Sequence, residues 1–304
     1  MPHVESNGIE LFYESFGEGV PILLTMGLGA QMTLWRTDFC TQLAERGYRV
    51  IRFDNRDIGL STKLNDLDTG PFLRSVIPAF FSDRIEPPYR LRDMAADMVG
   101  LMDALGLDSA HIVGASMGGM ICQELAIRHP SRVRSLTSVM SSNGQRRHLK
   151  SDPRVLRYLL TRVEPERDKI VEHGVRTLRA VHGDFPFPEE EIRALLESNY
   201  DRAFDPRGYV RQLMAVVTAR SRVPGLRQLR MPCGVIHGTA DRLVLPSAGR
   251  ATAKAIPEAE LFMLEGMGHA LPRELWSVIH SAISKTVERG EERPLQPVHR
   301  AVGG

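Results

Sequence analysis

Residues 114–118 read Gly114-Ala115-Ser116-Met117-Gly118, between the apolar residues 111–113 and an amphipathic run that ends at Arg128. The first run is typical of a buried strand and the second of a helix, so the pentapeptide is expected at a sharp strand-to-helix turn. Its glycines remove the Cβ atoms that would clash in such a turn. The turn presents the serine hydroxyl at a helix N-terminus, where unpaired backbone N–H groups favour negative charge. These features predict acyl transfer with Ser116 as the nucleophile.

Two later turns carry the acid and the base that a serine nucleophile needs. Residues 235–238 are typical of a strand, and Asp241 lies in the loop after it. Residues 261–264 are typical of the next strand, and a glycine-rich turn after it ends in His269. A serine hydroxyl attacks only when an imidazole takes its proton, and a carboxylate must orient that imidazole. The chain order serine, acid, histidine therefore predicts a triad of Ser116, Asp241 and His269. The alternative interpretation of Ser116 is an ordinary helix N-cap.

From about residue 7 to residue 288 the chain resembles the α/β-hydrolase family. Besides the motifs above, residues 23–29 are similar to the family's third strand and the loop after it, and residues 52–61 to its Asp-x-Arg-Gly-x-Gly-x-Ser turn. The resemblance implies that the backbone N–H groups of Leu28 and Met117 form the oxyanion hole.

Two positions depart from the usual family pattern. Asp57 stands where a glycine is usual, and Met26 where many members have histidine. Both departures, the region around Trp35 and residues 267–272 are similar to the aclacinomycin methylesterase branch of the family. This resemblance implies a carboxylic-ester hydrolase.

Strand-like and helix-like patterns alternate along the first half of the chain. Residues 9–13, 21–25 and 49–54 are typical of strands, whereas residues 35–46 and 91–105 have apolar positions at helical spacing. This alternation predicts a mostly parallel sheet with helices on both faces. Together with the resemblance, it predicts the α/β-hydrolase fold.

The alternation stops between residues 144 and 224, where helical patterns occur among many charged residues without a convincing strand. An insertion at this point of a doubly wound sheet lies over the carboxyl ends of the strands, where ligands bind. We therefore expect residues 144–224 to form a helical cap on a discontinuous core of residues 1–143 and 225–304. The tail from about residue 289, with prolines, charges and a terminal Gly-Gly, is expected to be poorly ordered.

Composition limits the partners and the compartment. The chain has 304 residues, 42% of them hydrophobic, and 39 basic against 37 acidic residues leave a formal net charge of +2. No strong field favours a nucleic acid or an anionic membrane, so we expect neither as a partner. The three cysteines form no Cys-x-x-Cys pair, residues 1–10 are polar, and no run of eighteen apolar residues occurs. These features favour a cytoplasmic protein with reduced thiols.

The sequence predicts neither a cofactor nor a metal. Residues 27–29 resemble the start of a dinucleotide fingerprint, but Met32 stands in place of the third glycine. His173 and His182 lack metal-ligand spacing, and the chain has no His-Glu-x-x-His motif and no cysteine cluster. We expect both histidines on the surface of the cap.

Our hypothesis is a serine esterase that hydrolyses a small to medium, largely apolar neutral ester through an acyl-enzyme. Perhydrolysis, hydrolysis of a carbon–carbon bond and acyl transfer use the same triad, so they stay open as alternatives. A ligand receptor with a hydrolase-like fold is a further alternative. The natural substrate and a homodimer are left open by the sequence.

Overall fold

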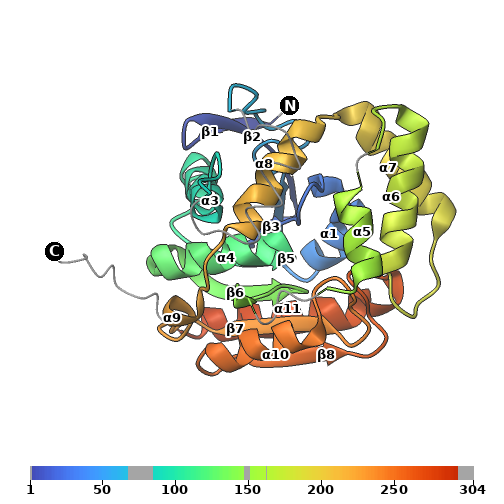
Figure 1. The fold of residues 1–304 in the computed structure, drawn as a ribbon. Helices are drawn as coiled ribbons and strands as arrows, with labels where there is room; N and C mark the ends of the chain where they lie inside the picture. Colours follow the sequence, from blue (N-terminus) through green and yellow to red (C-terminus); the bar gives the residue numbers. More distant parts are fainter. Residues whose placement is uncertain (1, 68–84, 147–150, 162, 294–304) are drawn as a thin grey trace.

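The computed structural model describes residues 2–67, 85–146, 151–161 and 163–293 (Figure 1). In this part of the chain eight strands form one sheet in the order β1-β2-β4-β3-β5-β6-β7-β8. The β1–β2 and β2–β4 pairs are antiparallel, and every other pair is parallel. The strands are β1 (His3–Ser6), β2 (Ile9–Phe16), β3 (Val20–Thr25), β4 (Tyr48–Phe53), β5 (Ala110–Ala115), β6 (Val133–Val139), β7 (Cys233–Gly238) and β8 (Glu260–Leu264).

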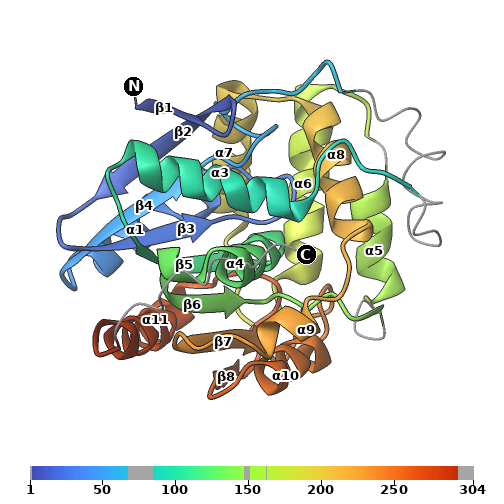
Figure 2. The same ribbon diagram turned by 90° about the vertical axis from the view of Figure 1, so that its left-hand side faces the viewer.

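Helices cover both faces of the sheet, and each face has its own core (Figure 2). Along β3, Ile22 and Leu24 belong to one core and Leu23 to the other, because successive strand residues point to opposite faces. The first core contains α1 (Thr37–Ala44) and α11 (Trp276–Glu291). The second contains α3 (Leu91–Ala104) and α4 (Met117–Arg128), and the end of α10 (Pro246–Ala255) packs against it. This arrangement confirms the predicted α/β-hydrolase fold.

Between β6 and β7 the described residues form helices rather than strands. These are α5 (Pro153–Leu160), α6 (Arg167–Val181), α7 (Glu189–Arg202), α8 (Pro206–Val217) and the short α9 (Val223–Leu226). Figure 2 shows α5 to α8 grouped beside the sheet rather than on either face. The division of the chain into a core and a cap stays a prediction.

The chain ends differ from the sequence-based expectations. Strand β1 was not expected, because its four residues, His-Val-Glu-Ser, are mostly polar and lack an apolar alternation. The tail prediction is wrong for residues 289–291, which continue α11 to Glu291. Two contacts with His111 hold this end of the helix. Gly290 packs so closely on the His111 ring that an added Cβ would lie 2.8 Å from Cε1, and the Glu291 carboxylate contacts Nε2 at 3.0 Å. Residues 294–304 lie outside the described residues.

Two histidines are buried in these cores as neutral side chains. Burial lowers the pKa of His111 to about 4, although the contact with Glu291 opposes the shift. Burial and the Arg46 charge lower the pKa of His280 to about 4, and the His280 ring lies 4.2 Å from that of Phe39.

We predict that the protein loses stability as the pH falls from about 6.5 to about 4, since the unfolded chain then binds protons that the folded chain does not. Each histidine contributes on the order of 3 kcal/mol to this loss. In urea unfolding at several pH values, His280→Leu should remove about one such contribution, whereas exposed His3→Gln should behave as the wild type. An unchanged pH slope in His280→Leu would contradict the assignment.

Candidate active site

Ser116 occupies the turn between β5 and α4 in a backbone conformation that is rare for any residue but glycine. Its φ is 57° and its ψ is −120°. The Ser116 N–H donates to the Val139 carbonyl at 2.9 Å, and the Ser141 hydroxyl donates to the Ser116 carbonyl at 2.7 Å. Two backbone groups of Ser116 are therefore held from the end of β6, while the side chain lines a cavity.

The glycines of the 114–118 motif are required by close backbone contacts. A Cβ at Gly114 would lie 2.2 Å from the Gly118 carbonyl oxygen, and a Cβ at Gly118 would lie 2.2 Å from the Thr25 carbonyl oxygen. A Cβ at Gly27 would lie 3.1 Å from the Ser116 Cβ. The turn after β3 and the turn after β5 therefore lie against each other at the carboxyl ends of neighbouring strands.

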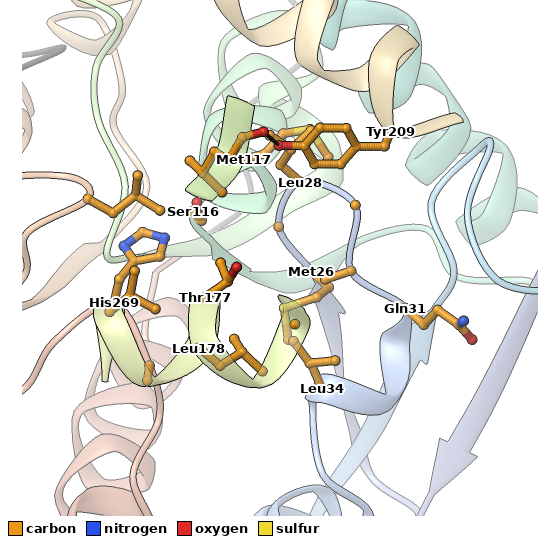
Figure 3. Close-up of a pocket in the computed structure, with 18 of the residues that line it drawn as sticks. Met26, Leu28, Gln31, Leu34, Ser116, Met117, Thr177, Leu178, Tyr209 and His269 are labelled. Atoms are coloured by element: carbon orange, nitrogen blue, oxygen red, sulfur yellow. Dashed lines mark hydrogen bonds between the residues drawn. The ribbon is translucent and has the colours of Figure 1, made fainter. Parts of the chain in front are cut away.

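Asp241 and His269 follow β7 and β8 and meet in the structure. Asp241 Oδ2 accepts a hydrogen bond from His269 Nδ1 at 2.7 Å. The other carboxylate oxygen, Oδ1, accepts from the Leu243 and Val244 N–H groups, both at 2.9 Å. These two bonds orient the buried carboxylate. Its contact is with Nδ1 of His269, and Nε2 has no hydrogen-bond partner among the described residues. Figure 3 shows the imidazole turned toward Ser116, and both residues line this cavity.

A second histidine, His237, lies behind Asp241. Its Nε2 donates to the Val244 carbonyl at 2.8 Å and lies 3.5 Å from Asp241 Oδ2. Burial lowers the pKa of His237, against the opposing charge of Asp241. A Cβ at Gly249 on α10 would lie 2.5 Å from His237 Nδ1, so the helix packs directly on the ring. His237 thus supports the loop that carries Asp241.

Two backbone N–H groups lie near Ser116, one in the loop after β3 and one at the start of α4. Asn55 Nδ2 donates to the Met26 carbonyl at 3.0 Å, and the Gly29 N–H donates to Gln212 Oε1 at 2.9 Å. Between them, the Leu28 N–H donates to no other group of the described residues. The Met117 N–H belongs to the first turn of α4, where N–H groups have no partner within the helix. Figure 3 shows Leu28 and Met117 together beside Ser116.

A cavity of about 1170 Å³ lies between these loops and helices α5 to α8. Its walls are chiefly apolar. The loops contribute Met26, Leu28 and Met140, and α4 contributes Met117. Helices α5 to α8 contribute Leu156, Leu178, Leu195, Tyr209 and Leu213, among others. Thr177 and Leu178 of α6 lie opposite the loop that carries Leu28, as Figure 3 shows.

The remaining candidate ligands and nucleophiles are buried or paired. Burial raises the pKa of the Cys40, Cys122 and Cys233 thiols to about 12, so none of them ionises at neutral pH. The prediction that His173 and His182 lie on the surface is wrong. His182 is buried with Nε2 3.1 Å from the Pro186 carbonyl, and half-buried His173 has Nε2 3.0 Å from the Tyr158 carbonyl.

The described residues offer neither a metal site nor a membrane-spanning helix. They contain no group of three or more histidine, cysteine or acidic side chains placed to hold a metal ion. Over the same ranges, every helix is too short or too polar to span a membrane.

A family model described as the alpha/beta hydrolase fold matches residues 20–272. The chain belongs to the α/β-hydrolase family. This hydrolase is 27% identical to rhodomycin D methylesterase DauP of Streptomyces sp. (strain C5), over 92% of this chain and 95% of DauP. It is 37% identical to the putative carbamate hydrolase RutD of Azorhizobium caulinodans over 139 residues, which are 46% of this chain and 44% of RutD. These matches confirm the expected resemblance and identify an esterase-type hydrolase.

Solved structures support the fold of this hydrolase. The enol-lactonase from Burkholderia xenovorans LB400 superimposes with a TM-score of 0.71 at 24% identity, covering 94% of this chain and 100% of that chain. At this identity the likeness shows the shared fold alone.

Sequence reasoning missed the groups of α6 and α8 that contact the site loops. The Val181 carbonyl accepts from the His269 N–H at 2.6 Å, and a backbone acceptor has no signature in the sequence. Gln212 left one signal, a polar residue directly before the apolar residues Leu213 and Met214 of a helical segment.

We predict that Gly118→Ala abolishes most hydrolysis, because the new Cβ would push α4 away from the Thr25 carbonyl and move Ser116. Gly106→Ala is the control, since its φ of 67° makes alanine unfavourable there while no atom lies within 4 Å of the added Cβ. Both variants should lose some thermal stability, and only Gly118→Ala should lose turnover. Near-normal turnover in folded Gly118→Ala would contradict this packing argument.

Proposed function

We propose that this hydrolase cleaves carboxylic esters through a covalent acyl-enzyme. Ser116 Oγ attacks the ester carbonyl while His269 Nε2 accepts its proton. The tetrahedral intermediate then expels the alcohol, which takes the proton back from His269. In the second half of the reaction, water attacks the acyl-enzyme, with His269 again accepting and then returning a proton, and the carboxylic acid is released. The observation that carries the proposal is the 2.7 Å bond between His269 Nδ1 and Asp241 Oδ2 beside the strained turn of Ser116.

Asp241 has an orienting role in this mechanism. By accepting from Nδ1, its carboxylate selects the tautomer in which Nε2 is the free base. It also lies close to the positive charge that His269 carries once it has taken the serine proton. Because two backbone N–H groups hold Oδ1, the carboxylate does not rotate away from the imidazole.

The negative oxygen of the intermediate would be bound by the N–H groups of Leu28 and Met117. The Met117 N–H also lies at the positive end of the α4 dipole. Both donors are backbone groups, so their positions depend on the backbone of the loops. The loop of residues 26–29 is held by hydrogen bonds to its own backbone.

The cavity favours a neutral, largely apolar ester of small to medium size. Its volume of about 1170 Å³ lies slightly above the range of ordinary ligand pockets, and most of its lining side chains are apolar. DauP, a relative over 92% of this chain, is named as a methylesterase, which supports an ester as the substrate. We propose that residues 144–224 act as the cap that sets substrate size.

The three free buried thiols support a cytoplasmic location.

Ser116→Ala and His269→Ala should each abolish ester turnover nearly completely in folded protein, as judged by circular dichroism. Asp241→Asn should lower kcat about 10⁴-fold and change KM much less, because the amide offers Nδ1 the wrong partner. The assay is a panel of p-nitrophenyl esters, which also reports acyl-size preference. Exposed Asp103→Asn is the matched control and should keep wild-type kcat. Wild-type kcat in Asp241→Asn would mean that another residue is the acid.

A further inference from the structure

Gln212 of α8 joins the loops that follow β3 and β4. Its side chain is fully buried. Oε1 accepts from the Gly29 N–H at 2.9 Å, and Nε2 donates to the Arg56 carbonyl at 2.9 Å. Since one partner only donates and the other only accepts, the amide has one possible orientation. Both bonds would be lost if the loops separated by a few ångströms.

The Gly29 N–H is the one that follows Leu28, within the turn of residues 27–30. The Ala30 N–H donates to the Gly27 carbonyl at 3.3 Å, and Gly29 has a φ of 68°, as the third position of a type II turn requires. The middle peptide of this turn consists of the Leu28 carbonyl and the Gly29 N–H, and the Leu28 N–H belongs to the peptide directly before it. The bond to Gln212 fixes this peptide.

Tyr209, one turn earlier on α8, holds the same glycine from its other side. A Cβ at Gly29 would lie 2.5 Å from Tyr209 Cδ2, so the ring packs directly on the Gly29 backbone. The Tyr209 hydroxyl donates to the Leu159 carbonyl at 2.9 Å, which fixes the ring (Figure 3). The loop is thus held by an amide and by a ring from one helix face.

Helix α8 is itself fixed to the core beside this contact. Arg211 Nη2 and Nε lie 2.7 and 2.9 Å from the two carboxylate oxygens of Asp57, and both side chains are buried. Asp57 has a φ of 73°, which costs free energy for a residue other than glycine. A Cβ at Gly208 would lie 2.2 Å from the Asp57 carbonyl oxygen, so no gap separates α8 from this loop. The helix therefore provides a rigid support for Gln212.

From these contacts we propose that Gln212 is a positioning residue that directs the Leu28 N–H toward the oxyanion. This inference rests on the proposed function, in which that N–H binds the negative oxygen. Without the amide, the Gly29 N–H would be buried and unpaired, and the turn would shift to satisfy it. That shift would move the neighbouring Leu28 N–H away from the oxyanion site. Ground-state ester binding, which depends on the apolar walls, does not use this bond.

The test compares Gln212→Met with Gln123→Met. Gln123 is also fully buried, lies on α4 and bonds the Ser138 hydroxyl and Arg222, away from the loop of residues 27–30. Gln212→Met should lower kcat by about 10- to 100-fold with little change in KM, in the range seen when an oxyanion donor is lost. Gln123→Met should lose thermal stability without this loss of kcat.

A trifluoromethyl ketone with an apolar chain separates positioning from general damage, because its adduct with a serine hydroxyl carries an oxyanion. Its inhibition constant should rise in Gln212→Met by the same factor by which kcat falls. Gln212→Asn keeps an amide, but its side chain is one methylene too short to reach both loops. This variant should show the same losses, and it serves as the second test if Gln212→Met does not fold.

Unchanged kcat and ketone affinity in both folded Gln212 variants would overturn the positioning role while leaving the proposed function intact. A wild-type enzyme that neither hydrolyses esters nor binds the ketone would instead overturn the proposed function.

Discussion

The fold of the site depends on one strained turn, the left-handed conformation of Ser116 between β5 and α4. Such a conformation costs on the order of 1–3 kcal/mol in a residue with a side chain, so it persists only where the surroundings hold it. Here the end of β6 bonds the Ser116 backbone on both sides, and Gly114 and Gly118 allow α4 to approach β3 without a Cβ between them. Ser116 is therefore fixed by backbone contacts, and its hydroxyl needs no support of its own.

The helices between β6 and β7 brace the loops of the site as well as walling the cavity. The Val181 and His182 carbonyls at the end of α6 accept from the His269 and Gly268 N–H groups at 2.6 and 3.2 Å. Gly183 and Met267 continue this contact as an antiparallel bridge. On the opposite side Gln212 bonds the loop that carries Leu28. Substitutions in these helices can therefore alter turnover through the loops, in addition to substrate choice through the apolar walls.

Local patterns were sufficient to predict the fold and to select Ser116, Asp241 and His269 from the sequence. Strand periodicity, glycines at sharp turns and the order of the three residues are all visible in short stretches of chain. The structure brings Asp241 and His269 together, as expected, and places Ser116 on the same cavity.

What the sequence did not predict depends on contacts between distant segments. Strand β1 forms because β2 offers it an edge, not because its own residues are apolar. Helix α11 continues past residue 289 because Gly290 packs on the sheet, and His182 is buried by the turn that follows it. Gln212 had no recognisable partner until the fold placed Gly29 and Arg56 at the two ends of its amide.

The central claim, that Ser116 is a nucleophile activated by His269, is tested most directly by labelling with an alkyl fluorophosphonate followed by peptide mass mapping. We expect one adduct per chain, located on the peptide that contains residues 114–118, and loss of turnover in proportion to labelling. Ser116→Ala and His269→Ala should both remain unlabelled. An adduct found only on Cys40, Cys122 or Cys233, or full turnover by protein labelled at Ser116, would contradict the claim.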